Sequence, residues 1–256
     1  MIVVVPVDPP REGLVLSSLV EETPLSAADA VELYEAAVAD VLHAVTRSGG
    51  DLLVNYRDAE TLPDAYADGD PEAEVYAVAE DVLGDAVNAS DDSDGGGAVR
   101  FERQVGSSRS ARIGNTVAHL LEREGATGVG VLEPTVPLIR RTEIDSVAMS
   151  IRQHDVVIGP SQDGRTYITG FAEPIDFTDA YTMPEVATVA DRAVEAGLDV
   201  GFASMLPTVA TPAGLRTTIA TLEARTAAET PGGAVTAAVV DELGLSVGDD
   251  GGLESP

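Results

Sequence analysis

The sequence predicts an α/β protein with a mostly parallel β-sheet and helices on both of its faces. Segments typical of strands alternate along the chain with segments typical of helices, and this βαβα order favours parallel strands. Hydrophobic residues make up 44% of the 256 residues, which is enough for a sizeable core. We find no internal repeat, no change in composition and no linker that divides the sheet-forming part. We therefore expect one main domain over residues 1–228.

The first half of the chain supplies three strands and three helices. The apolar run at 2–6 predicts a buried strand, and an amphipathic helix is expected at 27–46 with Ser26 as its N-cap. The apolar pattern then predicts a strand at 51–56, a helix at 72–83, a short strand at 99–104 and a helix at 111–124 that ends at Gly125. The Asn, Asp, Ser and Gly residues at 88–97 are typical of a flexible, acidic surface loop.

The second half continues the same alternation. Strands are expected at 127–132, 155–158, 165–169 and 198–203. A capping-box-like start at Thr142 to Asp145 predicts a helix over 143–153, and further helices are expected at 183–196, 212–225 and 232–243. We expect 229–246 to contain a C-terminal helix that packs on the main domain. The Gly- and Asp-rich end, 247–256, predicts a disordered acidic tail.

The charge of the chain is strongly negative. Acidic residues number 44 against 15 basic residues, the net charge is −29, and the sequence contains no Lys. The acids are scattered along helices and loops and do not form an acidic tail, so most are expected to be solvated surface groups. Scattered carboxylates hold water and cations, which predicts adaptation to high salt. No basic stripe exists to neutralise phosphates, so no nucleic-acid partner is expected.

Several other classes of protein are disfavoured by the sequence. Without Cys there is no disulfide and no thiolate metal site. No apolar run approaches the roughly 20 residues of a membrane span. The N-terminus lacks a basic n-region and enters a strand, so a cytoplasmic location is expected. The three histidines are far apart, and neither a nucleophile elbow nor a Walker loop is present.

In an open α/β sheet, ligands bind beyond the carboxyl ends of the strands. This rule directs attention to three distant segments, 6–19, 132–139 and 159–165. The adjacent pair Arg140 and Arg141 follows the second of these segments. The pair has two interpretations: attraction of an anionic ligand, or charge balance against Glu143 and Asp145.

The stretch from Val156 to Phe171 is the most specific motif. A strand leads into Gly159-Pro160, turns through Asp163-Gly164 and re-enters a strand. Asp-Gly is also a common pair in ordinary hairpin turns, and this alternative stays open. The stretch resembles the signature of a glycosyltransferase-A-like family, which is related to 2-phospho-L-lactate guanylyltransferase and to the nucleotide-diphospho-sugar transferases. The family has a second Gly where this chain has Arg165.

Other segments follow the same order as in that family. They are the loop Pro10 to Leu19, the helix with Ile113-Gly114-Asn115-Thr116, the strand end Glu133-Pro134-Thr135-Val136-Pro137, and Thr208 to Leu215. The resemblance covers about 1–225 and implies a three-layer sandwich that binds a nucleotide or nucleotide-sugar, with Mg²⁺. It also implies a glycosyl or nucleotidyl transfer.

The resemblance also implies roles for individual residues. Asp163 is the expected catalytic acid and a metal ligand, with Glu133 and Thr135 near the metal. The nucleotide is expected to contact Pro6, Arg11, Gly13, Gly164 and Arg165. Arg11 and Arg165 have an alternative role in pairing with surface acids.

The chain departs from the family at most polar positions. Leu16 and Ser18 stand where the family has its basic loop residues, and Thr135, Thr208, Ala210 and Gly214 stand where it has Asp. These departures favour a second hypothesis, a catalytically inactive relative that binds a nucleotide or a protein partner. The sequence does not predict an oligomeric state.

Overall fold

The computed structural model describes residues 1–84, 87, 99–230, 232–248 and 250–255. The acidic loop predicted at 88–97 lies outside these residues. None of the helices in the described ranges combines the length and the apolar composition that crossing a membrane requires.

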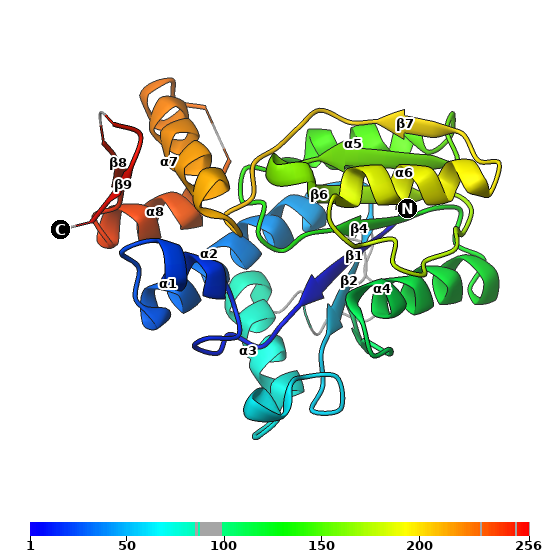
Figure 1. Ribbon diagram of the computed structural model, residues 1–256, viewed down its shortest axis with the longest axis horizontal. Coiled ribbons are helices and arrows are strands. Elements are labelled where there is room, and N and C mark those ends of the chain that lie inside the picture. The colour runs from blue at the N-terminus through cyan, green and yellow to red at the C-terminus, as the bar shows by residue number, and fades with distance from the viewer. Residues whose placement is uncertain (85–86, 88–98, 231, 249, 256) are drawn as a thin grey trace.

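A seven-stranded sheet forms the centre of the molecule (Figure 1). Its strands are β1 (Ile2–Val7), β2 (Asp51–Tyr56), β3 (Val99–Arg103), β4 (Val129–Leu132), β5 (Val156–Pro160), β6 (Thr166–Phe171) and β7 (Val200–Phe202). They lie in the order β3-β2-β1-β4-β6-β5-β7. The predicted fold class, a mostly parallel sheet with flanking helices, is confirmed.

Strand β6 runs antiparallel to both of its neighbours, β4 and β5. The reason lies in the short connection between β5 and β6, where Ser161 N donates to Arg165 O over 2.8 Å. A hairpin of this length joins only antiparallel strands, because a parallel pair needs a crossover of a dozen residues or more. The Asp-Gly turn that the sequence offered as the simpler interpretation is therefore present.

The remaining elements are mostly helices. They are α1 (Ser17–Glu22), α2 (Ala27–Thr46), α3 (Pro71–Leu83), α4 (Arg109–Ala118), α5 (Arg141–Ser150), α6 (Glu185–Glu195), α7 (Pro212–Ala227) and α8 (Ala234–Glu242). Shorter turns among the described residues are η1 (Asp64–Tyr66), the π-helical η3 (His119–Arg123) and η4 (Gln162–Gly164). Helix α1 has no counterpart in the prediction, and α5 begins two residues before its predicted start because Glu143 accepts a hydrogen bond from Arg140 N.

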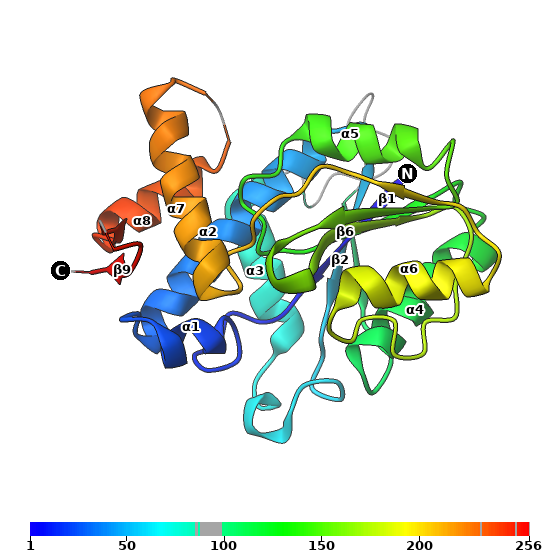
Figure 2. The ribbon, with the colours of Figure 1, turned by 45° about the horizontal axis from the view of Figure 1, so that its top comes forward.

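Alternate residues of β1 pack into two different cores. Val3, Val5 and Val7 are buried against residues of α2, α5 and α7, whereas Val4 packs with residues of α4 and α6. Figure 2 shows these two groups of helices on opposite sides of the sheet. The period-2 direction of side chains in a strand gives each face its own apolar layer.

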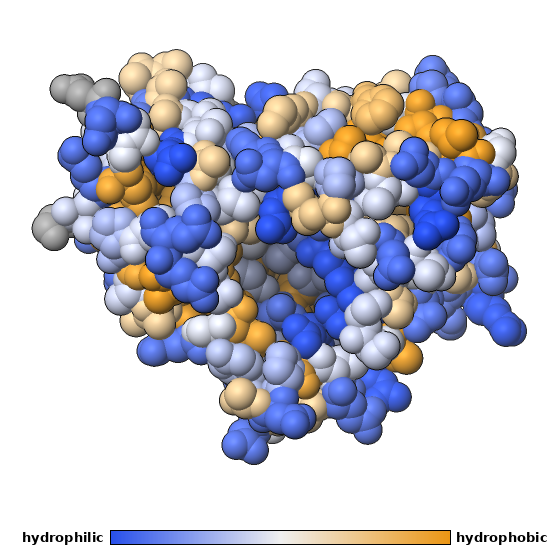
Figure 3. Space-filling model, in the orientation of Figure 1, coloured by the Kyte–Doolittle hydropathy of each residue, from blue (hydrophilic) through white to orange (hydrophobic). Residues whose placement is uncertain are grey.

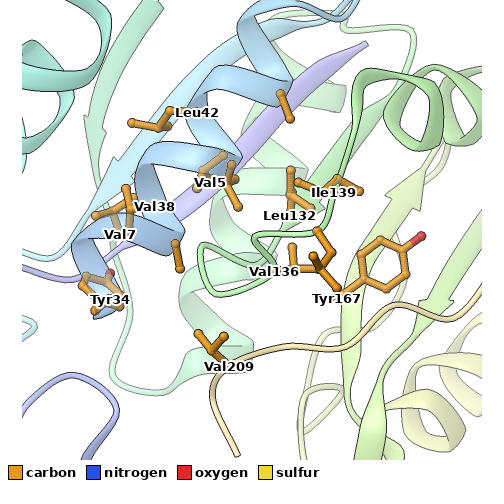
Figure 4. Packing of buried hydrophobic residues seen from close by; sticks show 14 of the residues in the cluster. Val5, Val7, Tyr34, Val38, Leu42, Leu132, Val136, Ile139, Tyr167 and Val209 are labelled. Atoms are coloured by element: carbon orange, nitrogen blue, oxygen red, sulfur yellow. The ribbon is translucent and has the colours of Figure 1, made fainter. Parts of the chain in front are cut away.

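Helix α2 is the main helix of the first core. Ser26 Oγ accepts from Asp29 N at 3.2 Å, and the Asp29 carboxylate accepts from Ser26 N at 2.8 Å, so the predicted N-cap forms a capping box. Figure 4 shows Val38 and Leu42 of α2 beside Val5 and Val7 of β1. This packing fixes the end of β1 relative to the helix, which matters for the site below.

The C-terminal part of the chain packs on α2. The Asp40 carboxylate accepts hydrogen bonds from Val235 N at 3.2 Å and Thr236 N at 2.8 Å, so α2 caps the first turn of α8. Two short strands, β8 (Ser246–Val247) and β9 (Leu253–Glu254), then pair antiparallel. Val247, Leu253 and Glu254 of the predicted tail lie in these two strands, and the expected disorder of 247–256 stays a prediction. The predicted division at residue 228 stays a prediction.

Candidate functional site

A cavity of about 330 Å³ lies at the carboxyl ends of the central strands. Figure 3 shows a hollow bordered by strongly hydrophilic residues at the centre of the molecular face, between α1 and α4. Its wall is formed by Pro6, Asp8, Leu14, Val15, Leu16, Ser17, Ser18, Tyr34, Arg57, Gln104, Arg109, Arg112, Ile113, Glu133, Pro134, Thr135, Arg165 and Ala210. The three segments that the sequence singled out each contribute to this wall.

Strand ends explain why polar residues gather here. Asp8 follows β1, Arg57 follows β2, Gln104 follows β3 and Glu133 follows β4. These four strands are parallel, so their carboxyl ends meet at one edge of the sheet. Antiparallel β6 brings Arg165, the residue before its first position, to the same edge.

Asp8 and Arg57 form the first polar pair of the cavity. Nη1 of Arg57 lies 3.6 Å from Oδ1 of Asp8, and Nε of Arg57 donates to Thr61 O at 3.1 Å. Asp8 N donates to the buried hydroxyl of Tyr34 at 2.9 Å. Burial raises the pKa of Asp8, although the charges of Arg57, Arg112 and Arg109 oppose the shift.

Arg112 is held by an amide side chain. Gln104 is buried, its Nε2 donates to Asn55 O at 2.8 Å, and its Oε1 accepts from Arg112 Nε at 2.7 Å. Arg112 therefore reaches the cavity from α4 with its orientation set by the sheet. Burial lowers the pKa of Arg112, and the neighbouring charge of Arg57 lowers it further. Its guanidinium stays protonated, because an arginine does not lose its charge in proteins.

Arg109 forms the central ion pair of the cavity. Its Nη2 lies 2.6 Å from Oε1 of Glu133 and 3.7 Å from Oε1 of Glu185, and its guanidinium lies 5.4 Å from the ring centre of Tyr181. Burial raises the pKa of Glu133, against the opposing charge of Arg109. Burial alone lowers the pKa of Arg109, but the two glutamate charges outweigh burial and raise it.

Two arginines present enclosed donors without partners. The Nε atoms of Arg109 and Arg165 make no hydrogen bond to any residue that the structure describes. A buried donor without a partner is costly, by about 1–3 kcal/mol. Both Nε atoms have almost no accessible surface, so these two donors are enclosed behind the cavity wall.

The charge of the cavity is opposite to that of the whole chain. Its wall carries four arginines, Arg57, Arg109, Arg112 and Arg165, against two acids, Asp8 and Glu133. The chain itself has a net charge of −29. A concave wall of one sign focuses the field and raises the local concentration of ions of opposite sign. The cavity is therefore suited to an anion.

Four of the site residues predicted from the sequence meet at this cavity: Pro6, Glu133, Thr135 and Arg165. Thr135 reaches it beside a buried pair of hydroxyls, because its Oγ1 lies 2.7 Å from Oγ1 of Thr208. This contact ties the loop after β4 to the segment before α7. The functional roles of these residues stay predictions.

Four other predicted site residues lie outside the cavity wall. Arg11 pairs with Glu74 of α3 through Nη2 at 2.6 Å and Nε at 2.8 Å, in agreement with the alternative of surface pairing. Gly13 packs near the Tyr66 hydroxyl. The structure thus places Arg11 on a surface acid and not in the wall where a phosphate would bind.

Asp163 and Gly164 belong to the β5–β6 hairpin turn. Asp163 is exposed at a φ of 59°, and Gly164, at a φ of 75°, packs near Pro184. Positive φ values in a tight turn explain the Asp-Gly pair by backbone geometry. Asp163 therefore does not line the cavity that Glu133 and Thr135 line, and its expected roles as catalytic acid and metal ligand stay predictions.

The adjacent basic pair also lies elsewhere. Arg140 forms an ion pair with Glu143 one turn into α5, as the charge-balance interpretation predicted. Neither Arg140 nor Arg141 lines the cavity at the strand ends.

Asp8, Arg57, Gln104, Arg109 and Arg112 were not among the site residues predicted from the sequence. The first three lie at or just after the ends of the strands predicted at 2–6, 51–56 and 99–104, so applying the strand-end rule to every strand would have found them. Arg109 and Arg112 are spaced three residues apart at the start of α4, which places them on one side of a helix. Their partners, by contrast, depend on tertiary packing.

The residues present do not by themselves form a magnesium site. Among the described residues, no three His, Asp or Glu side chains gather where a metal ion could bind. Both cavity acids face arginines, and the Thr135 hydroxyl is bonded to Thr208. A divalent cation here would have to compete with guanidinium groups for each carboxylate, so we derive no chemistry through a metal.

Comparison with known proteins concerns the fold. No family model matches the sequence, and no curated protein matches it. A solved structure from Desulfovibrio desulfuricans G20, assigned by inference as a nucleotide-diphospho-sugar transferase, aligns with a TM-score of 0.68 at 20% identity, covering 94% of this chain and 93% of that one.

Two more distant structures are a synthetase for CMP:2-keto-3-deoxy-manno-octonic acid with CTP and a manganese complex of a Mycobacterium tuberculosis H37Rv protein. The first has a TM-score of 0.48 at 13% identity, over 88% of this chain and 98% of that one. The second has a TM-score of 0.43 at 13% identity, over 84% and 95%. Of these three structures, the Desulfovibrio protein alone is similar enough to show the fold of this chain. This chain has the fold of a nucleotide-diphospho-sugar transferase-like structure.

Proposed function

We propose that this protein binds a nucleotide or nucleotide-sugar in the cavity at the strand ends and acts as a nucleotidyl- or glycosyltransferase. The observation that carries the proposal is the convergence of Arg57, Arg109, Arg112 and Arg165 on one wall. Guanidinium groups bind phosphate oxygens through paired hydrogen bonds. The phosphates of the ligand are the part that this wall would recognise.

The cavity also offers an apolar side for the rest of such a ligand. Leu14, Val15, Leu16 and Ile113 contribute to its wall. Its volume of about 330 Å³ is at the small end of the range of about 300–1,000 Å³ found for small-molecule sites. A compact nucleotide fits this combination of polar and apolar surface better than a large polymer.

The fold supports the same class of ligand. The similar Desulfovibrio structure is assigned as a nucleotide-diphospho-sugar transferase, and in open α/β sheets ligands occupy this strand-end position. Fold alone does not determine activity, so this support is an analogy. The arginines are the evidence from this chain itself.

A second function is binding without transfer. Asp163, the expected catalytic acid, lies outside the cavity, and the two cavity acids face arginines. A site built in this way holds an anion but offers no free carboxylate as a general base. A catalytically inactive relative that binds a nucleotide would have this arrangement.

Calorimetric titration with CTP, GTP and UDP-glucose in molar KCl, with and without Mg²⁺, tests the proposal. We expect at least one nucleotide to bind and Arg112→Gln to weaken binding by about tenfold or more. Arg152→Gln is the matched control, because Arg152 is exposed and lies outside the cavity. Absence of binding by all three nucleotides would contradict the proposal.

Product analysis then separates the two functions. A transferase releases a nucleoside phosphate or inorganic diphosphate when it is incubated with a bound donor and candidate acceptors. The inactive relative leaves the bound nucleotide intact.

A further inference from the structure

We infer that the arginine cluster of this cavity takes the place of a divalent cation, so that the site binds a diphosphate group without a metal ion. This inference deepens the proposed function, because it concerns the same cavity and the chemical class of the group it binds.

The cavity acids are poor candidates for holding a cation. Oε1 of Glu133 lies 2.6 Å from Arg109, and Oδ1 of Asp8 lies 3.6 Å from Arg57. Cation binding to either carboxylate would bring a second positive charge beside these guanidinium groups. The wall already holds four of them, so the repulsion would be large in a partly desolvated site.

The arginines, by contrast, keep guanidinium nitrogens that no described residue uses. The side chain of Arg112 bonds only through its Nε, to Gln104, and the guanidinium of Arg165 forms no hydrogen bond to a described residue. Phosphate oxygens are acceptors, and a diphosphate carries enough of them to reach several guanidinium groups at once.

Charge balance favours an anion. Four guanidinium groups face the carboxylates of Asp8, Glu133 and Glu185, the last of which lies 3.7 Å from Arg109, so an excess of positive charge remains. The lowered pKa of Arg112 reflects both burial and the nearby charge of Arg57. A bound diphosphate neutralises this excess. The arginines in turn neutralise the phosphate charges, which in many nucleotide sites is done by Mg²⁺.

The cluster is also preformed. Arg57 is tied to Thr61 O, Arg112 to Gln104, and Arg109 to Glu133 with Tyr181 beneath its guanidinium plane. Side chains that are already oriented lose little freedom when the ligand binds. These guanidinium groups are held in place by their hydrogen-bond partners, unlike arginines on a mobile surface patch.

Calorimetry with inorganic diphosphate tests the inference independently of any nucleotide. The titration is run in molar KCl and again at lower salt, once with EDTA and once with excess Mg²⁺ or Mn²⁺. We expect binding in EDTA to be at least as tight as with metal, because a bound cation neutralises the charge that the arginines recognise.

Two variants locate the site. Arg165→Gln is expected to weaken diphosphate binding about tenfold or more, since it removes one of the four guanidinium groups of the cavity wall, whereas Arg152→Gln leaves binding unchanged. Arg112→Gln serves as a second variant, and thermal unfolding of each protein shows that it is folded. Binding that requires metal, no binding in either buffer, or an unchanged Arg165→Gln would each overturn the inference.

The outcomes also separate this inference from the proposed function. Nucleotide binding that appears only with Mg²⁺ would leave the proposed function in place and refute the arginine cluster as a substitute for the metal. Diphosphate binding in EDTA without binding of any nucleotide would support the arginine cluster as a metal-free diphosphate site and would contradict the proposed nucleotide-binding function.

Discussion

Arg109 and Glu133 join two elements that are distant in sequence. Nη2 of Arg109, at the start of α4, lies 2.6 Å from Oε1 of Glu133, directly after β4. The side chain of Glu133 is 16% exposed and that of Arg109 is 37% exposed. The pair fixes the position of α4 above the sheet edge and orients one of the four cavity arginines.

Glu133→Gln is expected to destabilise the protein. The substitution removes the nearest counter-charge of Arg109 but leaves Glu185 at 3.7 Å, and Arg109 is partly solvated. The cost should therefore be about 1–2 kcal/mol, below the 3–5 kcal/mol of a fully buried pair. Chemical denaturation measures it. Glu74→Gln, which breaks the more exposed pair with Arg11, should cost less than about 1 kcal/mol. Equal costs for the two variants would contradict the expected role of Glu133.

Asp8→Asn is expected to change the pH dependence of stability. Burial raises the pKa of Asp8 in the folded protein, so ionised Asp8 destabilises the fold at neutral pH. This penalty is absent below the unfolded pKa of about 4 and grows as pH rises through the folded value.

Relative to wild type, the free energy of unfolding of Asp8→Asn should therefore increase between about pH 4 and pH 7, so that the variant gains stability over wild type as pH rises. Urea denaturation of both proteins at these two pH values, at constant salt, measures the difference. A difference that stays constant or falls with rising pH would refute the expected sign.

Gly214→Ala is expected to disturb the wall of the cavity from outside it. A Cβ at Gly214 would lie 2.0 Å from the backbone oxygen of Thr208, too close for any atom pair. Relief requires movement of the Thr208 backbone. This segment is held at Thr135 O by two donors, the Thr208 hydroxyl and Val209 N, each at 2.8 Å, so the cost should be about 2 kcal/mol or more.

Thermal unfolding checks the Gly214 prediction. Gly49→Ala is the control, because a Cβ at that position meets only the Asp145 carboxylate at 3.8 Å. A Gly214→Ala protein as stable as the control would show that the Thr208 segment is not held against α7.

Salt is expected to stabilise the whole molecule. A net charge of −29 makes the compact state repel itself, and added ions screen that repulsion. The melting temperature should rise with KCl concentration, with each kcal/mol gained corresponding to about 2–4 °C for a chain of this size. Differential scanning fluorimetry over a KCl series measures it, and a flat series would remove the support for adaptation to high salt.

The sequence by itself determined most of the secondary structure and the fold class, although α1, β8 and β9 were not predicted. The helix at 27–46 and the strand at 51–56 were predicted with the bounds that the structure has, because strong apolar periodicity and the Ser26 capping box act locally. The direction of β6 follows from the short hairpin that precedes it. The βαβ order also predicted that a ligand would bind at the carboxyl ends of the strands.

Only the tertiary structure decided which residues at that edge form a site. Arg11 and Arg165 are equally basic in the sequence, yet one pairs with Glu74 while the other enters the cavity. Asp163 was favoured by a motif, but its side chain lies on the exposed side of a turn. Charged side chains are long, and their ion-pair partners come from elements tens of residues away in the chain. The local sequence pattern therefore determines neither the direction of such a side chain nor its partner.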